Sequence, residues 1–236
     1  MEIHDVEERG IMDFAYDQQR DAAQKLQPFD AVQAQETWIP GTLEGSRIHV
    51  LVWTDTRVQP RAVVQLVHGM TEHMGRYADF ASFLVSNGFA VVGHDHLGHG
   101  KTQMPQRQQL GHIPLRNGAQ LLVDDVHKVR SYAQNHFGAA LPYVIFGHSM
   151  GSFITRCYIA DYGTGLSAAV ICGTGNPRLA ASKAGNLLCS VVARLKGQTH
   201  QSKLVDALAV GGYNSSIANP RTPFDWLSYN RDNVDS

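Results

Sequence analysis

The five residues 147–151 (GHSMG) stand between an apolar run and a helical pattern, and this arrangement constrains the fold more than any other part of the sequence. The preceding run, LPYVIF, favours a buried strand, and residues 152–162 favour a helix. A serine at such a sharp turn needs small neighbours, which explains Gly147 and Gly151. The turn would present the hydroxyl at a helix N-terminus, whose free N–H groups stabilise an anion. The pattern therefore predicts a nucleophilic Ser149, against the alternative of a glycine-rich turn.

Apolar runs and helical patterns alternate along the middle of the chain. Runs that are apolar on both faces are typical of parallel strands covered on each side, and the stretches between them follow the spacing of one buried helix face. One stretch ends at Asn87-Gly88, a favourable C-terminal cap. This β-α-β-α order predicts an α/β fold with a mostly parallel sheet and helices on both faces. The expected strands are 61–67, 89–93, 143–146 and 168–172, and the expected helix faces carry Phe80, Phe83 and Leu84, then Leu122, Val126, Val129 and Ala133.

The sequence divides into three expected parts. Residues 1–35 are polar with few apolar side chains and predict a helix or arm on the body. Residues 36–177 form the expected α/β core, which opens with an antiparallel hairpin of strands 36–40 and 47–53. From 178 to 236 the strand pattern stops, and helices and loops are expected. An apolar stripe in this last part suits either ordinary helix packing or the wall of an apolar pocket; it comprises Leu187, Leu188, Val191, Val192 and Leu195.

A second motif, His68-Gly69-Met70, directly follows the strand expected at 61–67. Acyl transfer requires two backbone N–H donors where negative charge develops on the reacting carbonyl oxygen. The residue after the nucleophile, Met150, would supply one, and Met70 would supply the other. Taken by itself, this motif is better explained by a strand-end turn with a buried histidine, but together with the serine motif it favours the oxyanion role. The residues expected to support these groups are His68, Gly69, Gly147, His148 and Gly151.

Three motifs together resemble the monoacylglycerol lipase and lysophospholipase branch of the α/β-hydrolases: HGMTEHMGRY at 68–77, HDHLGHGKT at 94–102 and GHSMGS at 147–152. The resemblance extends over residues 37–176. It implies the α/β-hydrolase fold and a serine esterase that cleaves acyl esters of monoacylglycerols or lysophospholipids through an acyl-enzyme. It also implies that residues 178–236 form a helical cap over the acyl pocket, where transient contact with a membrane surface would occur.

The same resemblance implies a triad acid and a triad histidine after Ser149, in that order. One later histidine, His200, lies in the expected cap, and Asp161 is the one acidic residue between it and Ser149. Asp161 is expected at the end of the serine's own helix, a poor place for a triad acid. We therefore expect the triad Asp and His, with the last two strands of the fold, to be absent, and this chain to be an inactive amino-terminal portion of a longer hydrolase. The alternative is a non-catalytic, hydrolase-like binding protein.

Charge and composition narrow the class of partner. Lysine and arginine number 20 against 21 aspartate and glutamate, so the net charge of −1 gives no reason to expect a nucleic acid. The 43% hydrophobic content excludes disorder. The amino end is acidic, and no run reaches the roughly 18 apolar residues of a membrane span, so a cytoplasmic protein with a small acyl-ester lipid as substrate is expected. A strand at 168–172 left as an exposed apolar edge would promote oligomerisation or aggregation.

Neither a metal nor a cofactor is expected. Cys157, Cys172 and Cys189 match no zinc or disulfide spacing and predict reduced, buried thiols. The histidines at 94, 96 and 99 match no structural zinc motif and predict a structural network instead. Gly100-Lys101-Thr102 follows a strand, but a phosphate-binding loop requires glycine five positions earlier, where Asp95 stands.

Overall fold

A computed structural model describes residues 32–105, 110–114, 116–176, 179–197, 199–210, 213–222 and 224–235. The chain divides into two compact units, Met1–Thr174 and Gly175–Ser236. The arm expected at 1–35 lies almost wholly outside the described residues. The first unit contains the sheet and the motifs described above, and the second is helical.

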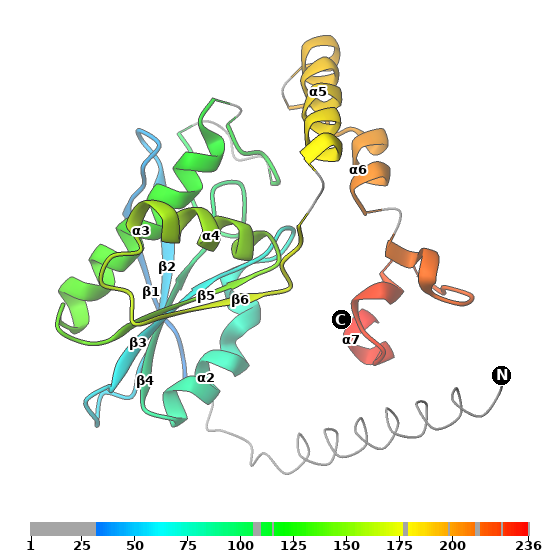
Figure 1. The fold of residues 1–236 in the computed structure, drawn as a ribbon. Coiled ribbons are helices and arrows are strands. Elements are labelled where there is room, and N and C mark those ends of the chain that lie inside the picture. Colours follow the sequence, from blue (N-terminus) through cyan, green and yellow to red (C-terminus); the bar gives the residue numbers. More distant parts are fainter. Residues whose placement is uncertain are drawn as a thin grey trace, which may run out of the picture. The chain divides into compact units, whose positions relative to one another are not determined.

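The first unit is built on a six-stranded sheet in the order β1-β2-β4-β3-β5-β6 (Figure 1). β1 pairs antiparallel with β2, and β2 with β4, whereas β4, β3, β5 and β6 are parallel neighbours. This confirms the predicted hairpin and the mostly parallel sheet. The strands are β1 (Gln35–Pro40), β2 (Arg47–Trp53), β3 (Ala62–Val67), β4 (Phe89–His94), β5 (Tyr143–His148) and β6 (Ala168–Cys172).

Helices cover both faces of this sheet, as predicted (Figure 1). α2 (Ala78–Ser86), preceded by the short helix η1 (Met74–Tyr77), packs on one face. α3 (Gly118–Phe137) and α4 (Met150–Tyr162) pack on the other. Every side chain of the central strand β3 is buried, because alternate residues enter the two cores. The packing of the sheet between these helices therefore holds the carboxyl ends of β3, β4 and β5 in fixed positions.

Strand β6 is the outer strand of the described sheet and pairs with β5 alone. Its sequence, AAVIC, is apolar, yet four of its five residues are exposed, including Val170 with 42% of its surface accessible. An apolar edge with unpaired backbone groups is a template for strand addition from another molecule. The predicted exposed edge at 168–172 is therefore present in this unit.

Val170→Lys is expected to reduce self-association of the protein, because a charged side chain on an edge strand opposes pairing with a second edge. Size-exclusion chromatography with light scattering over a concentration series measures the effect. Val58→Lys is the matched control, since Val58 is also exposed (53%) but lies outside the sheet. A wild-type protein that stays monodisperse at all concentrations would contradict the prediction.

The second unit consists of helices joined by short loops. These are α5 (Leu179–Lys196), α6 (Lys203–Val210), η2 (Tyr213–Ser216), η3 (Asp225–Leu227) and α7 (Arg231–Asp235). The apolar stripe predicted at 187–195 lies on α5. Among the described residues, no helix combines the length and the apolar character needed to cross a membrane.

The prediction that the cysteine side chains are buried is wrong, since Cys157, Cys172 and Cys189 are all exposed. Cys157 lies on α4, whose buried face carries Ile154 and Tyr158 and leaves the cysteine on the outer face. Cys172 is exposed because β6 is an edge strand. An apolar run does not reveal by itself whether its strand is central or at an edge.

Candidate active site

Ser149 occupies a strained turn between β5 and α4. It directly follows the last residue of β5 and is the N-cap of α4, with φ 52° and ψ −119°. A non-glycine residue rarely adopts a positive φ, and the cost of about 1–3 kcal/mol is borne where the surrounding structure enforces it. Here the Ser149 N–H donates to the carbonyl of Cys172 (3.0 Å), and the Ser149 carbonyl accepts the N–H of Ser152 (2.9 Å). This is the strand–turn–helix geometry predicted for a nucleophilic serine.

The two glycines beside the serine allow backbone contacts that no other residue permits. A Cβ on Gly151 would lie 2.0 Å from the carbonyl oxygen of Val67, at the end of β3. A Cβ on Gly147 would lie 2.3 Å from Oγ1 of Thr155 and 2.5 Å from the carbonyl oxygen of Gly151. The start of α4 therefore contacts the end of β3 directly, which is the crowding that the sequence predicted.

Ser149→Gly is expected to raise the free energy of unfolding of the first unit by about 1 kcal/mol, because glycine adopts a positive φ without strain. The gain exceeds the extra entropy that glycine gives to the unfolded chain, about 0.5–1 kcal/mol. Ser149→Ala, which keeps the Cβ and the strain, is the control. Urea unfolding of the three proteins measures the difference, and equal stabilities of the glycine and alanine variants would contradict it.

The loop after β3 lies against the serine. A Cβ built on Gly69 would be 3.1 Å from the Cβ of Ser149, so the sheet brings the two predicted motifs together. His68 is fully buried, whereas Met70 is 52% exposed. Among the described residues, the backbone N–H groups of Met70 and Met150 have no hydrogen-bond acceptor. Met70 directly follows Gly69 in this loop, and Met150 directly follows Ser149 at the start of α4.

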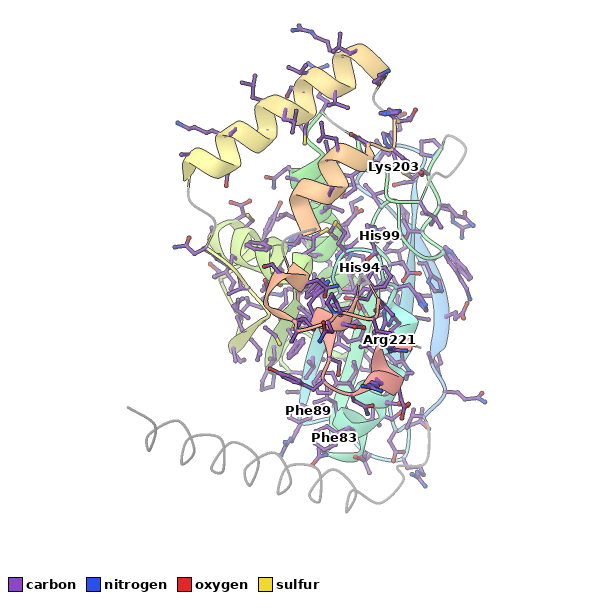
Figure 2. The ribbon with its side chains drawn as sticks, turned by 90° about the vertical axis from the view of Figure 1, so that its right-hand side faces the viewer. Phe83, Phe89, His94, His99, Lys203 and Arg221 are labelled. Carbon is purple, nitrogen blue, oxygen red and sulfur yellow. The ribbon has the colours of Figure 1, made fainter. Side chains whose placement is uncertain are left out.

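A group of four histidines lies beneath this loop: His68, His94, His96 and His99, of which Figure 2 labels His94 and His99. The His68 and His96 rings are tilted relative to each other with centroids 4.1 Å apart, and the His94 and His96 rings meet edge to face with centroids 4.8 Å apart. In the described part of the chain, no three His, Cys, Asp or Glu side chains are placed so that they could hold a metal ion. The ring contacts join these four histidines into a packed network.

Backbone contacts determine which nitrogen carries the proton in the rings of His68 and His96. His68 Nε2 accepts the N–H of His96 (3.0 Å), so its proton is on Nδ1, which donates to the Gly69 carbonyl (2.7 Å). His96 Nε2 in turn donates to the His68 carbonyl (3.1 Å). Burial lowers the pKa of His68 to about 4 and that of His94 to about 3, and it holds the pKa of His96 well below its ordinary value. Neutral histidines thus fix the backbone of the loop.

Asp95 joins three segments of the chain. Its carboxylate accepts the N–H of Met74 (2.7 Å), the N–H of Lys101 (2.8 Å) and Nδ1 of His49 (2.8 Å). Burial favours the neutral acid, but these hydrogen bonds outweigh it and hold the pKa of Asp95 well below its ordinary value. The carboxylate therefore anchors η1, which follows the loop that contains Met70.

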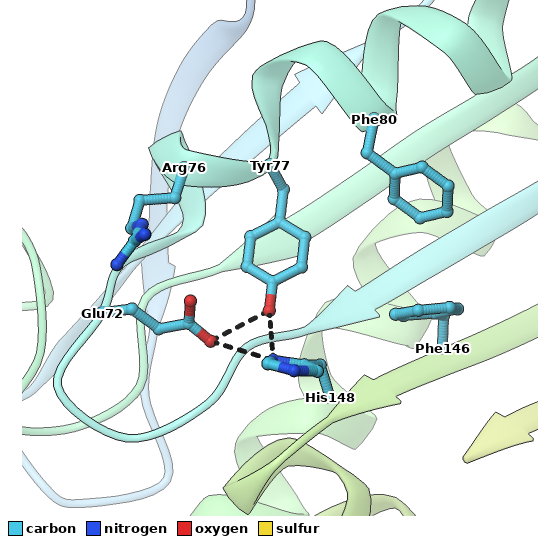
Figure 3. Close-up of a pocket in the computed structure, with 6 residues that line it drawn as sticks. All are labelled: Glu72, Arg76, Tyr77, Phe80, Phe146 and His148. Atoms are coloured by element: carbon cyan, nitrogen blue, oxygen red, sulfur yellow. Dashed lines mark hydrogen bonds and ion pairs between the residues drawn. The ribbon is translucent and has the colours of Figure 1, made fainter. Parts of the chain in front are cut away.

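A pocket of about 340 Å³ lies beside the serine turn (Figure 3). In it, the Tyr77 hydroxyl lies 2.9 Å from Oε1 of Glu72 and 3.1 Å from Nδ1 of His148. Burial, and then the neighbouring Glu72 charge, raises the pKa of Tyr77 well above its ordinary value, so the phenol keeps its proton. In the sequence, Glu72 and Tyr77 stand out only as letters of the motif at 68–77. The remaining lining residues are Arg76, Phe80 and Phe146.

The acidic residue that follows Ser149 in sequence is remote from it. Asp161 lies at the far end of α4, about 18 Å along the helix from Ser149 at 1.5 Å per residue. There it is exposed and accepts a hydrogen bond from Gln120 (3.2 Å). This confirms the position predicted for Asp161. His200 belongs to the second unit, between α5 and α6, and is also exposed.

Comparison with known proteins places this geometry in a family. The family model described as serine aminopeptidase, S33 (Hydrolase_4) matches residues 58–236, which include the serine turn, the loop after β3 and the second unit. The chain belongs to this family. Its fold is that of the α/β-hydrolases, and its sequence lies in the monoglyceride lipase-like branch.

Individual relatives agree with this assignment. The chain is 38% identical over 130 residues to a monoacylglycerol lipase of Mycolicibacterium smegmatis, in a match that covers 55% of this chain and 43% of the relative. It is 29% identical over 124 residues to the human monoglyceride lipase, covering 50% and 36%. The matched region thus spans less than half the length of these two relatives.

Solved structures give a longer match. The chain superposes on a thermostable carboxyl esterase of Bacillus coagulans, crystallised with glycerol, with a TM-score of 0.75 at 33% identity. It superposes on a lipase in its open form with a TM-score of 0.73 at 26% identity. Each match covers 86% of this chain and 64% of the other.

Proposed function

We propose that this protein contributes the nucleophile and the oxyanion donors of an esterase that cleaves carboxylic acyl esters of the monoacylglycerol or lysophospholipid type. The observation that carries the proposal is the strained Ser149, held at the N-terminus of α4 with the Gly69 loop against its Cβ. Backbone strain at a non-glycine residue clusters at functional sites. The relatives named monoacylglycerol lipase and carboxyl esterase support the substrate class.

In the proposed reaction, the Ser149 Oγ attacks the ester carbonyl carbon, and the carbonyl oxygen becomes an oxyanion. The N–H groups of Met70 and Met150 donate hydrogen bonds to that oxygen, and such a donor typically lowers the barrier by about 3 kcal/mol. The alcohol leaves with a proton, and an acyl-Ser149 remains. Water then attacks the acyl carbon and releases the fatty acid. The apolar α5 supports a role of the second unit as a cap for an acyl chain.

We infer that neither His148 nor His200 is the general base of this reaction. The Nδ1 of His148 is engaged with Tyr77, and Asp161, the one acid between Ser149 and His200, lies at the far end of α4. Without a base, a serine hydrolase keeps only about 10³–10⁴-fold of its acceleration over the uncatalysed reaction. The 236-residue protein is therefore expected to hydrolyse p-nitrophenyl butyrate at this residual level, and His200→Ala is expected to leave the rate unchanged.

A fluorophosphonate probe tests the proposal directly. We expect slow labelling over hours, mapped by tandem mass spectrometry to Ser149, and no labelling of the Ser149→Ala variant. Ser131→Ala, which removes an exposed hydroxyl on α3, is the matched control and should be labelled like the wild type. Equal labelling of the Ser149→Ala variant, or no labelling of the wild type, would contradict an esterase and favour a non-catalytic binding protein.

A further inference from the structure

Three polar side chains connect the loop that contains Met70 to the turn that contains Ser149. Glu72 lies in the loop after β3, Tyr77 is the last residue of η1, and His148 is the last residue of β5. Glu72 Oε1 accepts the backbone N–H of Gly69, the residue directly before Met70. Figure 3 shows the Tyr77 hydroxyl between Glu72 and His148, with dashed lines joining all three.

The donors and acceptors of this group match only one way. A carboxylate can only accept, so the Tyr77 hydroxyl donates to Glu72 Oε1. The phenol oxygen then accepts from Nδ1–H of His148, which fixes the tautomer of that ring. A continuous chain of hydrogen bonds therefore runs from His148 through Tyr77 and Glu72 to the N–H of Gly69.

This chain joins the residue that directly precedes one proposed oxyanion donor, Met70, to the residue that directly precedes the nucleophile. Gly69 precedes Met70, and His148 precedes Ser149. The Glu72 side chain is 13% exposed, so its hydrogen bonds are shielded from water. An unsupported loop of two or three residues would let the Met70 N–H drift, whereas a displacement of about 1 Å at a reacting centre can cost about 10²-fold in rate.

We propose that Glu72 is a positioning residue, which holds the Met70 N–H at a fixed place relative to Ser149 through Gly69 on one side and through Tyr77 and His148 on the other. This proposal rests on the function proposed above. It assigns the Glu72–Tyr77–His148 group to the alignment of the oxyanion donors, so Glu72 itself need not touch the substrate. The part of Glu72 that matters is an acceptor oxygen, and its charge is secondary.

The first test observes the hydrogen bonds themselves by NMR of the full 236-residue protein. In the wild type, the Gly69 amide proton should be shifted downfield and protected from exchange, and His148 should be protonated on Nδ1. Glu72→Ala should increase the Gly69 exchange rate at least tenfold, and Glu72→Gln, which keeps an acceptor oxygen, should preserve the protection. Tyr77→Phe should remove the acceptor of the His148 Nδ1–H, so the ring should no longer be held in the tautomer that is protonated on Nδ1. An unchanged Gly69 amide in Glu72→Ala would overturn the proposal.

The second test measures the rate of fluorophosphonate labelling of Ser149. Glu72→Ala should slow it at least tenfold at unchanged probe affinity, Glu72→Gln should recover it to within about threefold, and Tyr77→Phe should be intermediate. His73→Ala, an exposed neighbour on the same loop, is the matched control. Equal labelling rates for Glu72→Ala and His73→Ala would overturn the positioning role. A wild-type protein that is not labelled would refute the proposed function. In that case the NMR result alone would decide whether the hydrogen-bond chain exists.

Discussion

Replacing Gly151 with alanine is expected to destabilise the first unit by about 3 kcal/mol or more, and thus to remove a large part of its stability. The added Cβ would lie 2.0 Å from the Val67 carbonyl oxygen and 2.6 Å from that of His68. Both atoms belong to the backbone at the end of the central strand, where neither can rotate away. Relief of the clash requires α4 to move off β3, which would open the core that contains Ile154 and Tyr158.

The matched control for this substitution is Gly185→Ala. Gly185 also lies within a helix, α5, but a Cβ there meets nothing within 4 Å. Alanine should therefore stabilise that helix by about 0.5–1 kcal/mol through its greater helix propensity. Urea unfolding followed by circular dichroism and tryptophan fluorescence measures both variants. A Gly151→Ala protein as stable as the wild type would refute the proposed contact between α4 and β3.

The free energy of unfolding is expected to fall by about 4–6 kcal/mol between pH 6.5 and pH 5. The native protein keeps His68, His94 and His96 neutral, with pKa values of about 4 and about 3 for the first two and a strongly lowered pKa for the third. In the unfolded chain each histidine takes up a proton near pH 6.5. The unfolded state therefore binds more protons over this range, and stability rises with pH.

The size of this effect follows from the same pKa values. One histidine held neutral contributes about 1.4 kcal/mol per pH unit below 6.5, or about 2 kcal/mol at pH 5, and three such groups act together. The carboxylates of Asp95 and Glu72 face His68 and favour its charged form, but burial outweighs them. Stability continues to fall until the pH reaches the native pKa values, near 4 and 3.

Urea denaturation at pH 7, 6 and 5 tests this prediction. His96→Gln should lower stability at pH 7, yet its loss of stability between pH 7 and pH 5 should be smaller than that of the wild type by about 2 kcal/mol. His136→Gln, an exposed histidine on α3, should leave the pH dependence unchanged. A wild-type stability that is flat from pH 7 to pH 5 would show that the buried rings titrate normally.

Local sequence patterns predicted the sheet well, because burial on both faces requires apolar residues throughout a strand. The exception within β3 is Gln65, which is fully buried. It is tolerated because its amide donates to the Val126 carbonyl (3.0 Å) and accepts the hydroxyl of Tyr143 (2.8 Å). Such partners come from other elements, so a pattern within one strand cannot reveal them.

The site was predictable only in part, for the same reason. The turn around Ser149 depends on adjacent residues, and its motif is local. The hydrogen-bond chain from Glu72 through Tyr77 to His148 exists because β3 and β5 are parallel neighbours in a register that pairs Val67 with Gly147. Sequence motifs contained these residues, but their mutual contacts follow from strand order. The exposure of Cys172 was mispredicted because it, too, depends on which strand is outermost, whereas Cys157 and Cys189 lie on helices.

The hydrogen bond from the Ser149 N–H to the Cys172 carbonyl gives the outermost strand an influence on the reactive residue. Edge strands open by local fluctuation more easily than central ones, without unfolding of the whole domain. Each opening of β6 at Cys172 releases one of the restraints that keep the serine at a positive φ. The fraction of molecules in which Ser149 keeps its positive φ then depends on the local opening equilibrium of β6. A partner strand added along that edge would increase this fraction.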